Sequence, residues 1–380
     1  MRRHALAFAC LCLTTGLAAQ RGAMFDRVAA ILGEHFVDRT FRRTELPQLV
    51  AELRPTALAT TTRREERDVV QELLEQVPAS HLALYSRATY QHLMDELAGQ
   101  ASPTLGCVLT RHRDLWFVDG VLDGGPAAAA GLRRGDQVLA IDGEPPLRSA
   151  RLDWRADDAW LADAPGHGVL VDAGDTVTLR IASRPGRSRD VAVTAKRTSS
   201  RAASAASLRE IEAAGHTFGY LHLWLVFAGA TELFERAADR FRDAEGLVFD
   251  LRGRGGHAAE VAPILRVLSQ LRDDGMPMVF LIDEGTRSAK EVLAYEIRAR
   301  GLGALVGERT AGAVLPASFE AIGDDAVLMF PRSRLGKHSR AIEGIGVRPD
   351  RRADDELPFA GGRDAILDAA IAILVQQLDG

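Results

Sequence analysis

The sequence predicts three parts: a helical N-terminal unit, a β-rich module, and an α/β domain with a mostly parallel sheet. Apolar residues recur at helical spacing in residues 24–100, short β-like runs separated by Gly, Pro and Asp fill residues 103–197, and strand and helix patterns alternate in residues 215–378. The chain has 380 residues, 47% of them hydrophobic and 26% charged, so it can bury several cores. We therefore expect two or three domains.

Residues 1–19 have the composition of a secretory signal peptide. Arg2 and Arg3 precede an apolar run, Ala5 to Leu13, and small residues follow up to Ala19. The run is much shorter than the roughly 20 residues that span a membrane, so we expect a cleaved signal and no stable membrane insertion. Cleavage removes two of the 47 basic residues and none of the 52 acidic ones. The sequence thus predicts a mildly acidic protein that is periplasmic or secreted.

Charge and cysteine content exclude further classes of protein. The net charge is −5 and the basic residues form no stripe, so we expect no nucleic-acid partner. Cys10 and Cys12 fall in the signal, which leaves Cys107 as the one cysteine of the mature chain. Intramolecular disulfides and cysteine-rich metal sites are therefore excluded. Cys107 lies in an apolar run and is expected to be a buried small residue.

Local patterns place the elements of the first two parts. Helices of the N-terminal unit are predicted by apolar residues at helical spacing: Phe25, Val28, Ile31 and Leu32, then Val69, Val70, Leu73 and Leu74 after the polar start at Thr62. Strands of the β-rich module are expected at 115–118, 137–141 and 176–181. Residues 198–214 are rich in Ser, Ala and Arg without a period, so we expect a linker there.

The third part, residues 215–378, alternates strands with helices. Strands are expected at 218–226, 246–251, 278–282 and 304–306, and helices at 231–243, 258–272 and 288–300. This order of βαβ units predicts a mostly parallel sheet covered by helices. Because ligands of such sheets bind beyond the carboxyl ends of the strands, the loops that follow the strands are the candidate sites.

Two of these loops carry residues suited to catalysis. The loop at 250–257 reads Asp-Leu-Arg-Gly-Arg-Gly-Gly-His, and its glycines would let backbone N–H groups approach a ligand. An ordinary strand-to-helix turn would have the same pattern. In the second loop Ser288 begins a helix, where free N–H groups stabilise a developing oxyanion. The structural alternative is a helix cap, because Ser288 and Glu291 also match a capping box.

Five motifs occur in a specific order: Gly219–Leu221, Asp250–Gly256, Ser288–Glu291, Gly307–Gly312 and Glu343–Asp350. The ordered set resembles the catalytic domain of the C-terminal processing (tail-specific) serine peptidases, a group that includes the tricorn protease core and the interphotoreceptor retinoid-binding protein. The resemblance implies a catalytic domain of the crotonase or Clp-protease type, built as a spiral of βαβ units.

The β-rich module resembles a PDZ domain through Leu105–Val108, Gly125–Asp136 and Ile141–Gly143. This resemblance implies that an extended peptide is added as a strand, with its terminal carboxylate bound by backbone N–H groups near Leu105, Gly106 and Cys107. Residues 148–168, with Trp154 and Trp160, look inserted relative to a minimal module. This segment leaves two alternatives: it covers the groove and prevents peptide binding, or the groove is open and binds a peptide.

The resemblance also bears on the general base. In the processing-peptidase branch the base is a lysine at the position of Ala313. The chain has three lysines: Lys196 ends the PDZ-like module, and Lys290 lies roughly 200° round the helix from Ser288 and should point away from it. Lys337 stays open as an alternative base.

The tricorn-like branch uses a histidine preceded by a serine, together with a glutamate. Ser80-His81, before the PDZ-like module, resembles this pair, and Glu343 matches the glutamate. A histidine suits a base near neutral pH, and a partner fixes its tautomer. The resemblance therefore implies His81 as base, with Glu343 acting directly or through Ser80. His257 and His338 are the competing histidines.

By the same resemblance, the oxyanion hole consists of the N–H of Ala289 and one from Gly255 or Gly256. Arg254 stands where the family has a small residue or Asn, so it would narrow a subsite or bind a substrate carboxylate.

The expected activity is that of a serine endopeptidase cleaving extended or unfolded peptides through an acyl-enzyme, with a peptide or protein as substrate and no metal or cofactor. The alternative is a non-catalytic protein of the same fold that binds a peptide or an apolar ligand, with Ser288 as a helix cap.

Ser288→Ala separates these hypotheses. If Ser288 is the nucleophile, the variant loses nearly all turnover and its free energy of unfolding is almost unchanged. If Ser288 is only a cap, the free energy of unfolding falls by about 1 kcal/mol and there is no turnover to lose. Denaturant titration and a peptide-cleavage assay on the same two preparations distinguish the outcomes.

Overall fold

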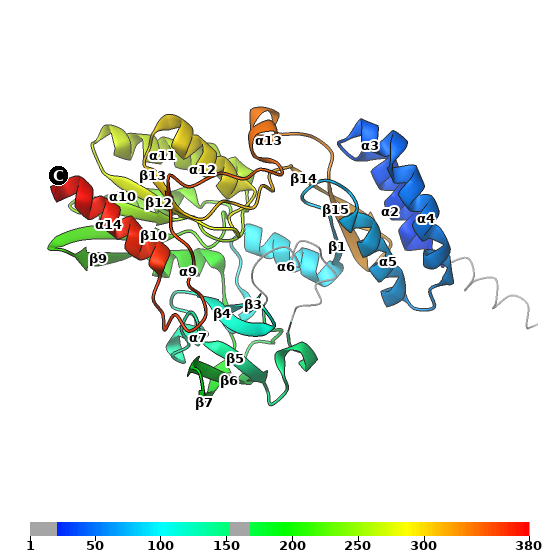
Figure 1. The fold of residues 1–380 in the computed structure, drawn as a ribbon, viewed down its shortest axis with the longest axis horizontal. Helices are drawn as coiled ribbons and strands as arrows, with labels where there is room; N and C mark the ends of the chain where they lie inside the picture. The colour runs from blue at the N-terminus through cyan, green and yellow to red at the C-terminus, as the bar shows by residue number, and fades with distance from the viewer. Residues whose placement is uncertain (1–20, 153–167, 380) are drawn as a thin grey trace, which may run out of the picture. The chain divides into compact units, whose positions relative to one another are not determined.

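The computed structural model describes residues 21–152 and 168–379, which divide into two compact units (Figure 1). The first unit comprises residues 21–90 and 316–334, and the second comprises residues 91–152, 168–315 and 335–379. The expected signal at 1–19 and most of the expected insertion at 148–168 lie outside the described residues.

Helices pack on a three-stranded antiparallel sheet in the first unit. The helices are α2 (Ala23–His35), α3 (Arg39–Thr44), α4 (Leu46–Ala59) and α5 (Arg63–Glu75). The strands lie in the order β1 (Ala83–Ser86), β15 (Ala326–Pro331) and β14 (Ala317–Ile322). The predicted helical N-terminal region is present, but the hairpin β14–β15, which the sequence pattern assigned to the α/β domain, completes it.

A shared core explains this correction. Phe330 of β15 is fully buried and clusters with Phe25 of α2 and Leu73 of α5. A polar contact adds to the unit, because the buried Glu66 carboxylate accepts from the N–H of Met24 at 2.8 Å and so caps α2. The apolar pattern of residues 317–331 identifies strands but does not reveal which core they join.

The β-rich module of the second unit is a five-stranded antiparallel sheet. Its strands follow chain order: β3 (Cys107–His112), β4 (Leu115–Val121), β5 (Gln137–Ile141), β6 (Thr176–Arg184) and β7 (Arg187–Thr194). A short pair, β2 (Ser102–Thr104) with β8 (Lys196–Thr198), closes the module, and α7 (Pro126–Ala129) packs beside it. Cys107 is buried, and burial raises the pKa of its thiol to about 12.

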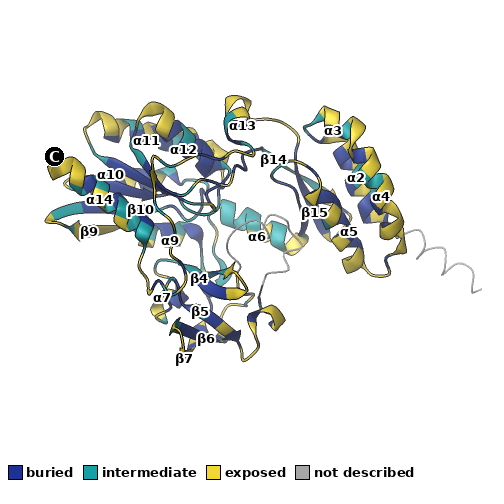
Figure 2. Ribbon diagram, viewed as in Figure 1, coloured by how far each residue is buried: buried dark blue, intermediate teal, exposed yellow. Residues whose placement is uncertain are grey.

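The α/β domain contains a six-stranded sheet in the order β16 (Arg351–Arg352), β13 (Ala304–Gly307), β12 (Met278–Ile282), β11 (Gly246–Asp250), β10 (His216–His222) and β9 (Arg209–Ala213). Only the edge pair β9–β10 is antiparallel. Helices α10 (Thr231–Arg240), α11 (Val261–Asp273) and α12 (Ala289–Arg300) cover one face, and α14 (Ala365–Asp379) covers the other (Figures 1 and 2). The predicted parallel sheet covered by helices is confirmed.

The segment 198–214, expected as a linker, contains helix α9 (Ser200–Ala206) and strand β9. Ser199 caps α9, because its hydroxyl accepts from the N–H of Ala202 at 3.1 Å. Ser204 is fully buried and accepts from the N–H of Trp224 at 2.9 Å. The small side chains that suggested a flexible linker instead allow the helix to pack closely.

The module is attached to the α/β domain at two places. Trp224 donates its indole N–H to Asp123 at 3.1 Å, and its ring lies against Gly120. On the other side Arg134 pairs with Asp355. Gly135 lies so close to the 357–360 segment that a Cβ atom there would be 2.3 Å from the Ala360 nitrogen. The second attachment therefore requires glycine at position 135.

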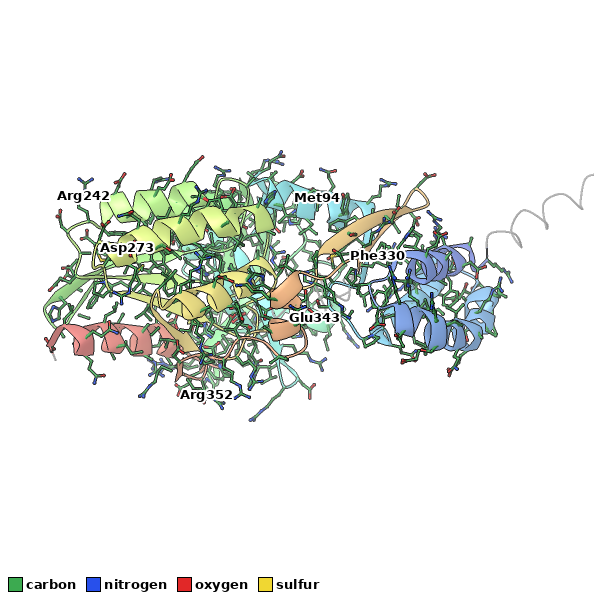
Figure 3. The ribbon with its side chains drawn as sticks, turned by 90° about the horizontal axis from the view of Figure 1, so that it is seen from above. Met94, Arg242, Asp273, Phe330, Glu343 and Arg352 are labelled. Atoms are coloured by element: carbon green, nitrogen blue, oxygen red, sulfur yellow. The ribbon has the colours of Figure 1, made fainter. Side chains whose placement is uncertain are left out.

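Phe330→Ala tests whether the hairpin belongs to the first unit (Figure 3). Truncation of a fully buried Phe should cost about 3–5 kcal/mol. Hydrogen exchange should accelerate in α2 and α5 while the six-stranded sheet keeps its protection. The matched control is Phe280→Ala, which removes an equally buried ring from the α/β core. Equal acceleration in both units by Phe330→Ala would contradict the assignment.

Candidate active site

The loops after β11 and β12 lie side by side at the carboxyl edge of the sheet. The Asp283 carboxylate, which follows β12, accepts from the N–H of Gly253 at 3.0 Å. Thr286 is fully buried and donates to Asp283 at 2.8 Å and to the carbonyl of Leu251 at 3.2 Å. The two loops singled out by the sequence are therefore joined directly to each other.

Ser288 has a strained backbone at the start of α12. Its φ of 55° and ψ of −123° lie in a region that non-glycine residues rarely adopt. The chain contains a relaxed capping box for comparison: Thr62 before α5 has φ −126° and ψ 154°, and its hydroxyl accepts from the N–H of Glu65 at 3.2 Å. A helix cap does not need a strained backbone, so the conformation of Ser288 points to a role beyond capping.

Glu291 connects the serine to a third loop. Its carboxylate is fully buried and accepts from the hydroxyl of Thr310 at 2.5 Å and from the N–H groups of Gly312 and Ala313, both at 2.7 Å. It also accepts from the N–H of Ser288 at 3.3 Å. Burial raises the pKa of Glu291, and these hydrogen bonds oppose the shift. The carbonyl of Ala313 in turn accepts from the N–H of Ser288 at 2.8 Å.

Gly255, rather than Gly256, lies against the serine. A Cβ atom at Gly255 would be 2.5 Å from the Cβ of Ser288 and 3.2 Å from the nitrogen of Ala289, whereas one at Gly256 would meet the backbone of Val226. Among the described residues, neither the N–H of Gly255 nor that of Ala289 donates to a protein acceptor. Two backbone donors beside one hydroxyl are the groups that an oxyanion hole requires.

Glu343 follows helix α13 (Gly336–Ile342; Figure 3) and binds the loop that contains Ala313. Its carboxylate accepts from the N–H groups of Val314 at 2.9 Å and Leu315 at 3.2 Å. Glu343 is therefore next to the segment whose carbonyl at Ala313 binds Ser288. The second unit thus brings together Ser288, Ala289, Gly255 and the loop that holds Glu343.

Ser80 and His81 belong to the first unit, just before β1. The Oγ of Ser80 is 2.9 Å from Nδ1 of His81. His81 is 5% exposed and has a positive φ of 59°. A buried imidazole in an uncommon backbone conformation differs from an ordinary surface histidine.

The competing bases have other contacts. Lys337 and His338 both bind the Glu296 carboxylate at 2.7 Å. The hydrogen bond from Lys337, followed by that from His338, lowers the pKa of Glu296 to about 2. Glu296 is about 12 Å along α12 from Ser288. His257 is exposed in the glycine loop.

More charged side chains surround this site than the sequence motifs indicate. Arg252 pairs with Asp250 at 2.5 Å and Asp364 at 2.6 Å, and Tyr220 donates to Asp250 at 2.8 Å. Burial alone would raise the pKa of Asp250, but Arg252 outweighs it and keeps that pKa well below its usual range. Arg254 pairs with Glu96 of helix α6 (Arg87–Leu97) at 2.6 Å. In the sequence, Arg254 between two glycines was the one sign of these charges, and local spacing could not identify Glu96 as its partner.

The peptide site expected in the β-rich module is partly used by the chain itself. The N–H of Gly106 donates to the hydroxyl of Thr104 at 2.9 Å, and the carbonyl of Leu105 accepts from Ala127 at 2.8 Å. Strand β3 is an edge strand that pairs only with β4 among the described strands. Its second edge is the place where an added strand would bind.

Two family models match the chain. Residues 265–353 match the peptidase family S41, and residues 117–155 match the PDZ domain. The tricorn protease homolog 1 of Streptomyces coelicolor is 26% identical over 402 aligned residues, which cover 95% of this chain and 36% of that protein. The carboxyl-terminal-processing protease of a Picosynechococcus species is 26% identical, with 78% and 74% covered. This chain therefore spans only about a third of the tricorn homologue.

Solved structures share the fold. The photosystem II D1 C-terminal processing protease aligns with a TM-score of 0.54 at 21% identity, covering 91% of this chain and 98% of that one. The tricorn protease aligns with a TM-score of 0.54 at 16% identity, covering 96% and 37%. In the described part of the chain, no helix is long and apolar enough to cross a membrane. Within that same part, no cluster of three or more His, Cys, Asp or Glu side chains could hold a metal ion.

Gly255→Ala tests the close approach to Ser288. The new methyl group would overlap backbone and Cβ atoms that cannot move independently, so Ser288 should shift. We expect the rate of Ser288 phosphonylation by a fluorophosphonate probe, measured by intact mass, to fall about a hundredfold. Gly253→Ala is the control, because its Cβ meets nothing within 4 Å and carries only the strain of a positive φ. Equal rates in the two variants would contradict the prediction.

Proposed function

Because this chain is related to the S41 peptidases, as its motifs predicted, we propose that it is a serine endopeptidase that cleaves extended or unfolded peptides. One observation carries the proposal: the hydroxyl-bearing residue with the strained backbone, Ser288, lies against Gly255 and begins a helix whose first N–H has no acceptor among the described residues. This arrangement suits a nucleophile next to an oxyanion site.

In the proposed reaction, the Oγ of Ser288 attacks a peptide carbonyl while His81 takes its proton. The N–H groups of Ala289 and Gly255 stabilise the negative oxygen of the tetrahedral intermediate. Collapse of this intermediate breaks the C–N bond, and His81 donates the proton to the leaving amine. Water then attacks the acyl-serine ester, again with His81 as base. The bond between the acyl carbon and Oγ breaks, His81 returns the proton to Ser288, and the second product is released.

Ser80 and Glu343 support this role of His81 in the proposal. A histidine that accepts a proton at Nε2 carries its hydrogen at Nδ1, and in the proposal the Oγ of Ser80, 2.9 Å from Nδ1, accepts that hydrogen bond. The mechanism requires the carboxylate of Glu343 to stabilise the imidazolium, directly or through Ser80. Its hydrogen bonds from the N–H groups of Val314 and Leu315 orient it in its own unit.

The β-rich module and the N-terminal sequence extend the proposal. We assign to the edge of β3 the capture of an extended peptide beside Leu105–Cys107. The signal-like composition of residues 1–19 supports a periplasmic or secreted location. The rival function is a non-catalytic peptide- or apolar-ligand-binding protein, which the capping position of Ser288 favours.

The test is incubation of the protein with a mixed library of unstructured peptides, read by mass spectrometry. We expect cleavage by the wild type and at least a thousandfold slower cleavage by Ser288→Ala and by His81→Ala. Glu343→Gln keeps an oxygen to accept from the 314–315 backbone but removes the charge, so a slower rate in this variant identifies an electrostatic role.

The possible results separate the hypotheses. No cleavage by the wild type would favour the binding-protein function. Cleavage that survives His81→Ala but not Ser288→Ala would overturn the assigned base and return His257, His338 and Lys337 to consideration. Cleavage that also survives Ser288→Ala would refute the proposed peptidase site.

A further inference from the structure

Lys290 is a buried cation close to the candidate site that the proposed reaction does not use. Its side chain has no exposed surface. Its ammonium donates to the carbonyl of Arg252 at 2.6 Å and to that of Trp224 at 3.4 Å. The sequence predicted that Lys290 points away from Ser288, and its ammonium does bind other groups. These groups, however, belong to the backbone segments that shape the site.

Arg252, whose carbonyl Lys290 binds, lies at the start of the loop that carries Gly255. That loop has other fixed points: the N–H of Gly253 binds Asp283 at 3.0 Å, and the carbonyl of Gly255 accepts from Val226 at 2.9 Å. Trp224 and Val226 belong to one segment, which follows β10, and Lys290 therefore connects the start of the loop to the segment that binds Gly255.

The surroundings account for a lysine in this buried position. Burial lowers the pKa of Lys290 to about 7; Asp250 and Asp283 favour its charged form, whereas Arg254 and Arg252 oppose it. A buried ammonium is costly unless its donors are used. Here two carbonyls use them, and an apolar side chain of the same length would leave both carbonyls without this donor.

We propose that Lys290 is a positioning residue that holds the 252–255 loop in the conformation in which the N–H of Gly255 faces the reacting carbonyl. The inference rests on the proposed peptidase function. Lys290 touches neither substrate nor the reacting atoms in this role. It acts through the loop, so its loss should affect the transition state more than substrate binding.

The test compares Lys290→Met, which keeps the length and loses the donors, with Lys196→Met, which removes an exposed lysine of the same unit. We expect kcat of Lys290→Met to fall about a hundredfold or more, as when an oxyanion donor is lost, with KM within threefold. Hydrogen exchange of residues 252–257 should become faster in Lys290→Met only. Lys290→Arg, which restores donors and charge, should recover part of kcat.

A folded Lys290→Met with kcat within threefold of wild type would overturn the inference, as would a fall in kcat without faster exchange in 252–257. If Lys290→Met does not fold, Lys290→Gln, whose shorter side chain carries no charge, decides by the same criteria. A wild type without Ser288-dependent cleavage would refute the proposed function instead. Exchange of residues 252–257 would then still show whether Lys290 fixes the loop.

Discussion

The buried carboxylate of Glu291 is the constraint on which the geometry of the site depends. It accepts from the backbone of Ser288, from Thr310 and from two N–H groups of the 312–313 segment, so it fixes the serine and the loop beside it with one side chain. A buried carboxylate without these donors would cost several kcal/mol. The donors and the carboxylate therefore have to fold together, and this coupling can maintain the strain at Ser288.

Charge pairs fix the neighbouring loop, residues 252–257, as Glu291 fixes Ser288. Arg252 is held by two aspartates, Arg254 by Glu96, and the carbonyl of Arg252 by Lys290. These contacts come from elements far apart in the chain, so they restrain a loop whose glycines would be flexible in isolation. In the proposed reaction, such a loop would hold the N–H of Gly255 in place before a substrate binds, as electrostatic stabilisation requires.

The sequence predicts the secondary-structure elements and the motifs better than it predicts the contacts between residues far apart in the chain. Ser288, the glycine loop and the Ser-x-x-Glu pattern follow from local spacing, and the parallel sheet follows from the alternation of strands and helices. Local spacing could not show that Glu291 also binds the Thr310 loop or that Lys290 supports the Arg252 carbonyl. It could not show that β14 and β15 join the N-terminal helices, because Phe330 and Phe25 are about three hundred residues apart. The small residues at 200–206 form a helix and not the expected linker, because Ala and Ser suit close packing as well as flexibility.

In the proposed function, the strained Ser288 is a nucleophile and not only a helix cap. Acid quenching during turnover of an activated ester, followed by peptide mapping, tests it directly because an acyl-enzyme is trapped as a mass increase on one residue. We expect an acyl group on Ser288 that disappears when the substrate is exhausted. Turnover of the ester with no adduct on Ser288, or with the adduct on another side chain, would contradict it.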